Sequence, residues 1–144
     1  MNTLIINKEN RAQYENTSID FDGSINIEAG LGYVSFISIK ASALICALAG
    51  SGIKAGSGIK AGWGIEAGEG IEAGWGIKAG EGIEAGWGIT AKFISVTLRI
   101  FAGLIMHRLP TEDEMKITAE IRSGTVCSGN VVKPVIEERK EGAK

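Results

Sequence analysis

The sequence predicts an all-β protein, a parallel β-solenoid (β-helix) whose coils consist of Gly-x-Gly-Ile-x-Ala hexads. Seven consecutive hexads run from Gly50 to Ala91, with two positions of the hexad varying. Two glycines in every hexad disfavour a helix by about 2 kcal/mol per hexad relative to alanine. In Ile-x-Ala, the two-residue period of a strand places Ile and Ala on one face and the variable residue on the other. Stacked coils then bury columns of Ile and Ala, as in other repeat proteins.

The segments around the array predict three parts in the chain. Residues 1–24 form an N-terminal cap, in which a short strand at Leu4–Ile6 precedes a short helix. Residues 25–106 form the solenoid, because hexad-like fragments precede and follow the array. Residues 107–144 form a C-terminal appendage, where alternating apolar residues around a Ser-Gly-Asn turn predict a β-hairpin at 115–137, followed by a charged tail.

The number of hexads in one coil decides which variable residues lie side by side. Tryptophan recurs in every second hexad with glutamate in the hexad between, so coils of two hexads stack Trp on Trp and alternate the charges of neighbouring coils. Coils of three hexads instead place Lys60 against Lys78 and Glu66 against Glu84. We favour six or seven two-sided coils of two hexads, with glycines bending the chain at positive φ. Three-sided coils of three hexads are the alternative.

Composition and charge narrow the possible functions. The chain has 144 residues, 44% of them hydrophobic, and a net charge of -2, whereas a general nucleic-acid binder is far more basic. We therefore expect no direct contact with nucleic acid. Two cysteines, Cys46 and Cys127, make neither a metal quartet nor a disulfide framework. Without a recognisable signal peptide or bilayer-spanning stretch, we expect a protein of the cytoplasm that has no contact with a membrane.

Residues suited to catalysis are scarce. His107 is the single histidine of the chain, so a histidine-based metal cluster or a Cys–His pair has little support. The glycines match no GxxxxGK[ST] phosphate-binding loop. Carboxylates such as Glu69 and Glu81 belong to a repeated surface column and form no distinct acid–base pair. We therefore expect no enzymatic activity, no cofactor and no bound metal.

Two sets of repeated side chains are candidate partner-binding surfaces. In two-sided coils the tryptophans form one aromatic column, and exposed aromatic rows mark interfaces. An acidic face opposite them suits a basic partner protein, such as a nucleic-acid-binding effector. The alternatives are rings that shield the backbone and an ordinary solubilising surface. The candidate residues are Trp63, Trp75, Trp87, Glu69, Glu72, Glu81 and Glu84.

The predicted hairpin is the candidate self-association element. Its apolar residues alternate with polar ones, and an exposed pair of strands invites edge pairing with a second copy. We expect a homodimer formed through Ile117, Ala119, Ile121, Val131 and Val132.

The array, preceded by Ile-Ile-Asn-Lys-Glu-Asn at residues 5–10, resembles small proteins of phages and mobile elements in low-GC bacteria. It is more loosely similar to hexapeptide-repeat β-solenoids, but it lacks the coil-interrupting loop with a catalytic histidine found in hexapeptide acyltransferases. The resemblance implies a non-enzymatic inhibitor of a host defence complex, such as an anti-CRISPR protein, that acts through protein–protein contacts. Two other hypotheses stay open: a structural component of a virion or appendage, and a carbohydrate-binding solenoid.

Overall fold

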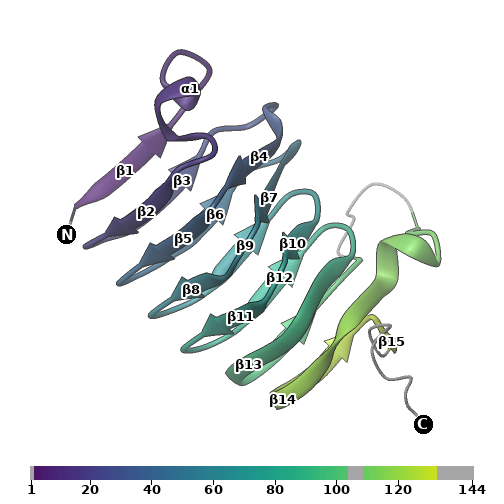
Figure 1. Ribbon diagram of the computed structural model, residues 1–144. Helices are drawn as coiled ribbons and strands as arrows, with labels where there is room; N and C mark the ends of the chain where they lie inside the picture. Colours follow the sequence, from purple (N-terminus) through teal and green to yellow (C-terminus); the bar gives the residue numbers. More distant parts are fainter. Residues whose placement is uncertain (1, 104–108, 133–144) are drawn as a thin grey trace, which may run out of the picture.

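A computed structural model of the chain, shown in Figure 1, describes residues 2–103 and 109–132. Strands make up 59% of the structure and helices 6%. Every pairing between the described strands is parallel, and the strands stack as a β-solenoid of about five turns. The predicted fold class is confirmed.

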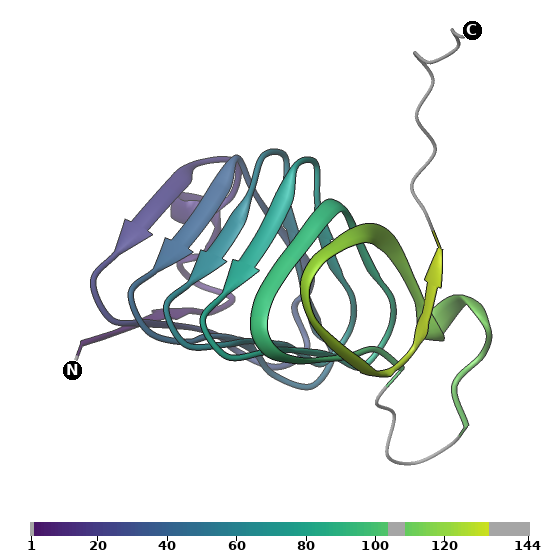
Figure 2. The same cartoon turned by 90° about the horizontal axis from the view of Figure 1, so that it is seen from below.

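Each coil has three sides that close around a common interior (Figure 2), and we name the sides by the strands that pair in each. Side A contains β2 (Ser18–Phe21), β5 (Ser38–Ala41), β8 (Ile59–Ala61) and β11 (Gly76–Ala79). Side B contains β1 (Thr3–Ile6), β3 (Ser24–Ile27), β6 (Ile45–Ala47), β9 (Ile65–Ala67) and β12 (Ile83–Ala85). Side C contains β4 (Gly32–Phe36), β7 (Ser51–Ala55) and β10 (Ile71–Ala73).

Two long strands wrap around all three sides. β13 (Ile89–Phe101) pairs with β10 on side C, with β11 on side A and with β12 on side B. β14 (Lys116–Ser128) follows the same path alongside β13, and β15 (Asn130–Val132) begins the next coil on side C. Parallel pairing therefore starts before residue 25 and continues after residue 106.

The coil length differs from the prediction. Ile71 pairs with both Ile53 and Ile89, so one coil of the array consists of three hexads. The preference for two-sided coils of two hexads is wrong, as is the expected number of six or seven coils. The physical reason lies at the corners: in a three-sided coil each Gly-x-Gly turns the chain through a third of a full turn, whereas a two-sided coil needs a complete reversal of direction at each corner. The charges that favoured two hexads are exposed, and exposed charges contribute little to stability.

Columns of isoleucine fill the interior. On side C, Ile53, Ile71, Ile89 and Ile117 stack in register, and each is 0% exposed. Sides A and B carry equivalent buried columns, and the alanine of each Ile-x-Ala unit is buried beside them. A β-branched side chain suits the strand backbone, and complete burial of one isoleucine contributes about 1.5–3 kcal/mol. The coils are therefore held together mainly by these columns.

Except for Gly50, the first residue of the array, the glycines of the array bend the chain without adopting positive φ. From Gly52 to Gly88, none is among the glycines with positive φ, so that expectation is wrong. The constraint is the close approach of the neighbouring coil: a Cβ atom on Gly74 would overlap the carbonyl oxygen of Gly56. Positive φ occurs instead where the longer N-terminal coils turn from side B to side C, at Gly30, Gly32 and Gly50.

The N-terminal segment covers the outer edge of the first complete coil. α1 (Arg11–Tyr14) lies beside β4, where the Arg11 guanidinium donates hydrogen bonds to the carbonyl oxygens of Leu31 (2.9 Å) and Tyr33 (3.4 Å). Arg11 also donates to the Glu15 carboxylate at 2.9 Å, and this bond lowers the pKa of Glu15. These contacts protect an edge strand from pairing with other chains. The boundary of the predicted cap at residue 24 stays a prediction.

The C-terminal segment is not the predicted hairpin. β14 and β15 pair in parallel, with Ile117 opposite Val131, so the turn after Ser128 leads into a further coil. The alternation that suggested a hairpin strand instead continues the core, because Ile117 and Ala119 are buried. A short 3-10 helix, η1 (Asp113–Met115), precedes β14. Residues 133–137 of the predicted hairpin, and the charged tail after them, lie outside the described residues.

We predict that two glycines at the same corner of neighbouring coils respond differently to alanine. Gly74→Ala forces a methyl group against the Gly56 carbonyl and lowers the free energy of unfolding by more than about 1 kcal/mol. Gly56→Ala meets its nearest atom, the Ile37 carbonyl oxygen, at 3.8 Å. It is neutral or stabilising by about 0.4–1 kcal/mol, because alanine restricts the unfolded chain. Urea unfolding measures both, and equal losses would contradict the close-approach explanation.

Candidate functional site

The variable residue of each Ile-x-Ala unit points away from the core, and the parallel register stacks these residues into one column per side. On side A the column is Asp20, Lys40, Lys60, Lys78 and Ser95. On side B it is Asn26, Cys46, Glu66, Glu84 and Phe101. On side C it is Ser35, Lys54, Glu72, Thr90 and Thr118. Like charges therefore collect on sides A and B, whereas opposite charges meet on side C.

Side B presents an open acidic column. Glu66 and Glu84 are direct neighbours in the register, and both are exposed. Within residues 2–103 and 109–132, neither carboxylate forms an ion pair. The two glutamates line a shallow hollow of about 560 Å³ together with Cys46 and Leu48. The negative charge of this side is thus available to a partner.

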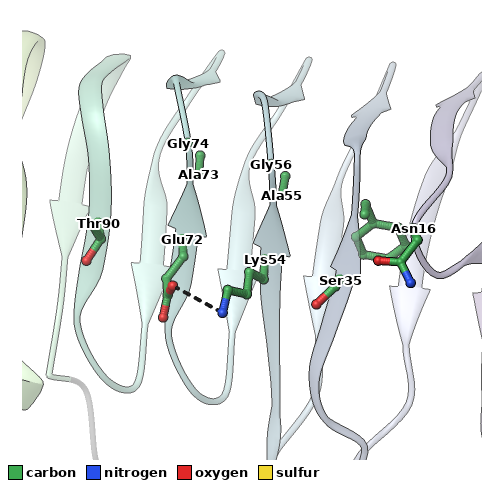
Figure 3. A pocket seen from close by; sticks show the side chains of 10 residues that line it. Asn16, Ser35, Lys54, Ala55, Gly56, Glu72, Ala73, Gly74 and Thr90 are labelled. Atoms are coloured by element: carbon green, nitrogen blue, oxygen red, sulfur yellow. Dashed lines mark ion pairs between the residues drawn. The ribbon is translucent and has the colours of Figure 1, made fainter.

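Side C shows the opposite arrangement. The Nζ atom of Lys54 lies 3.9 Å from the Glu72 carboxylate, and Figure 3 shows the two side chains turned toward each other from adjacent strands. Ser35 and Thr90 continue the column on either side of this pair, and all four residues line a hollow of about 420 Å³ with Asn16. Glu72, which the sequence assigns to an acidic face, is therefore a paired carboxylate on a mixed side.

The tryptophans lie at three different corners. Trp63 lies between sides A and B, where its carbonyl accepts a hydrogen bond from the Glu81 backbone N–H of the next coil. Trp87 lies between sides B and C and donates its backbone N–H to the Glu69 carbonyl. Trp75 lies at the third corner, between sides C and A. The expected single columns of Trp and of Glu are wrong, because coils of three hexads place Trp63 beside Glu81 at one corner and Trp87 beside Glu69 at another.

The three indole rings also differ in exposure. Trp63 is 50% exposed and Trp75 is 57% exposed, whereas Trp87 is partly covered by Tyr33, whose ring centroid lies 6.5 Å from that of Trp87. Burial, and secondarily the charges of Glu72 and Glu69, raise the pKa of Tyr33. The rings at the two corners of side A are therefore the accessible ones.

The predicted self-association residues divide into two groups. Ile117 and Ala119 are 0% and 1% exposed and belong to the core columns, and Ile121 packs against the core. Val131 and Val132 on β15 are 47% and 41% exposed. Ile117 and Ala119 are thus not accessible to a second copy, and self-association through the other predicted residues stays a prediction.

Sequence reasoning did not select Glu66 or the lysines of side A, namely Lys40, Lys60 and Lys78. The signal for them is present, because a coil of three hexads pairs Lys60 with Lys78 and Glu66 with Glu84. The expectation of opposite charges on neighbouring coils disfavours that register. Exposed charges interact too weakly to determine the register.

We predict that Cys46 reacts more slowly than Cys127 with iodoacetamide at neutral pH. Burial, and secondarily the Glu66 charge, raise the pKa of the Cys46 thiol and so reduce its thiolate fraction, whereas Cys127 is exposed. Glu66→Gln accelerates labelling of Cys46 and leaves Cys127 unchanged. Time-resolved peptide mass spectrometry measures both sites, and equal rates in the parent protein would contradict the placement of Cys46 in the side B hollow.

His107 lies outside the described residues. Among the residues that the structure describes, no three or more His, Cys, Asp and Glu side chains are grouped so that they could hold a metal ion. In the same part of the chain, no helix has the length and apolar character needed to cross a membrane. No protein-family model, curated protein or solved structure matches this chain.

Proposed function

We propose that the protein is a non-enzymatic interaction protein that inhibits a bacterial defence complex, in the manner of an anti-CRISPR protein, by binding a basic surface of that complex through side B. The observation that supports this proposal is the stacking of Glu66 on Glu84 without a counter-ion in the described structure. Such a function belongs to the cytoplasm of a bacterial host and needs no cofactor.

The acidic column is unfavourable for the isolated protein. Like charges directly opposite each other on neighbouring strands destabilise a sheet, whereas opposite charges contribute about 0.2–1 kcal/mol. Side C uses the favourable solution, with Lys54 next to Glu72 at 3.9 Å. A lysine in place of Glu66 or Glu84 would give side B the same benefit. The presence of a repulsive pair that one substitution would remove supports a role in binding.

A basic partner removes this repulsion. Glu69 and Glu81 belong to the two corners that bound side B, so the fold places two further acidic residues at the margins of this side. Surfaces that bind nucleic acid are positively charged, and an acidic face competes for them through charge complementarity. Steric occupation of a nucleic-acid groove then inhibits the complex without any chemical step.

A structural role is the second candidate. β15 pairs only with β14 among the described strands, and its Val131 and Val132 are exposed. An edge strand of this kind can pair with another chain, which favours end-to-end assembly in a virion or appendage. Light scattering of the purified protein at several concentrations tests this role, and a monomer at all of them argues against it.

We predict that expression of the protein restores phage plaquing on a bacterium whose CRISPR system targets that phage. The double variant Glu66→Gln/Glu84→Gln loses this effect and no longer retains the effector complex in a nuclease-treated pull-down. Glu72→Gln is the matched control, because it removes a carboxylate that is already paired with Lys54, and it keeps both properties. The proposal would be overturned if expression of the parent protein did not increase plaquing in any of a set of strains with different CRISPR types.

The same variants make a prediction for stability. Glu66→Gln/Glu84→Gln raises the Tm because it removes a repulsive pair, whereas Glu72→Gln lowers it slightly because it removes an attractive one. Differential scanning calorimetry at low salt measures both shifts. A double variant with a lower Tm than the parent would show that the side B glutamates stabilise the fold, which would contradict a repulsive pair kept for binding.

A further inference from the structure

Side A carries a column of positive charge that is not evident from the net charge of the chain. Lys40, Lys60 and Lys78 are direct neighbours on β5, β8 and β11, and all are exposed. In the described part of the chain, none of these ammonium groups forms an ion pair. Neighbouring strands lie about 4.8 Å apart, so the three lysines repel one another as the glutamates of side B do.

Exposed aromatic rings border this column. Trp75, at the corner between sides C and A, is 57% exposed, and the Nζ atom of Lys92 lies 5.1 Å from its ring centroid. Phe93 holds the indole from one side in a T-shaped contact, with ring centroids 6.0 Å apart. The Arg122 guanidinium lies over the Phe93 ring at 3.9 Å. Trp75 is thus a supported ring with one cation beside it and a second on the Phe93 ring that supports it.

The acidic groups near side A lie at its margins. Asp20 ends the column next to Lys40, and Glu120 is paired with Arg122 at 3.1 Å. Glu81 occupies the opposite corner, next to Trp63. Positive charge is therefore concentrated between Lys60, Lys78 and the Trp75 corner.

We propose that side A binds single-stranded nucleic acid, with phosphates on the lysine column and a base stacked on Trp75. Proteins that bind single strands without sequence preference combine a positive surface that follows the backbone with aromatic rings on which bases stack. Side A has the positive column, and its corner with side C carries the aromatic ring. Its three neighbouring lysines and one supported indole fit a short site, on the order of four nucleotides.

A single strand fits these residues better than a duplex or an acidic protein. Duplex bases are already stacked and leave the indole without a partner, and no helix projects from side A into a groove among the described elements. An acidic polypeptide would use the lysines but gives no reason for an exposed, supported Trp75. The expectation of no nucleic-acid contact rests on a net charge of -2, which treats the surface as uniform. Separation of the charges onto different sides removes that objection.

Fluorescence anisotropy with labelled oligothymidylate and oligouridylate of about 15 nucleotides tests the proposal. At about 50 mM salt the parent protein binds, and the affinity falls as salt rises to about 200 mM. Lys60→Gln/Lys78→Gln weakens binding and reduces the slope of log K against log salt by about 1.4, the value expected for two lost phosphate contacts on a single strand. The matched control Lys8→Gln/Lys54→Gln removes the same charge away from side A and leaves the slope unchanged.

Trp75 supplies the second arm of the test. Trp75→Ala lowers the affinity by about tenfold through loss of base stacking, whereas Trp87→Ala at another corner has no effect. Circular dichroism verifies that each variant is folded. The glutamates of side B are unchanged in all these variants, so their outcome is independent of the charge-based inhibitory function proposed above.

Three results would overturn the inference. One is the absence of oligonucleotide binding by the folded parent protein at low salt. Another is equal weakening by the side A and control lysine variants, which indicates attraction to net charge alone. The third is polyglutamate binding that equals oligonucleotide binding and depends on Lys60 and Lys78 but not on Trp75. That third result would assign side A to an acidic protein partner.

Discussion

Each coil of this protein is joined to the next by parallel pairing that sets isoleucine directly on isoleucine. Three such columns, one per side, run through the interior, and the remaining features follow from their register. The register fixes the coil at three hexads within the array. It also brings Gly74 so close to Gly56 that no side chain fits between them. Backbone contact at the corners and burial of isoleucine along the sides are therefore two aspects of one constraint.

The register of the core also determines which surface residues are neighbours. The neighbour of each residue between Ile and Ala is fixed by the register, because the equivalent residue three hexads away in the array lies beside it. Lysine meets lysine on side A and glutamate meets glutamate on side B, while Lys54 meets Glu72 on side C. Repulsion at exposed positions is too weak to shift columns that each bury several isoleucines. One chain with nearly balanced charge thus presents sides of opposite sign.

The hexad alone predicts strands, parallel stacking and the identity of the buried residues, because alternation of Ile and Ala about one polar residue is a local property. It does not predict how many hexads close a coil, since that depends on the curvature at Gly-x-Gly. The recurrence of Trp63, Trp75 and Trp87 in every second hexad is real, but two hexads do not divide a coil of three, so the rings are distributed over three corners. The hairpin predicted from the alternation around Ile117 was wrong for another reason. Parallel and antiparallel strands show the same alternation, so the pattern does not predict the direction of pairing.

The three-sided coil has a consequence for how such an array changes in length. Insertion of one hexad would leave every isoleucine and alanine facing the interior, because each side uses the same repeat unit. All later residues would nevertheless move on by one side, so that Lys78 would leave the column of Lys60 and Glu84 would leave that of Glu66. Such an insertion would leave the packing of the core unchanged but would alter the distribution of charge over the sides. Only duplication or loss of whole coils preserves both the buried columns and the charged columns. The coil, and not the hexad, is therefore the unit by which the array can change in length without altering its surface.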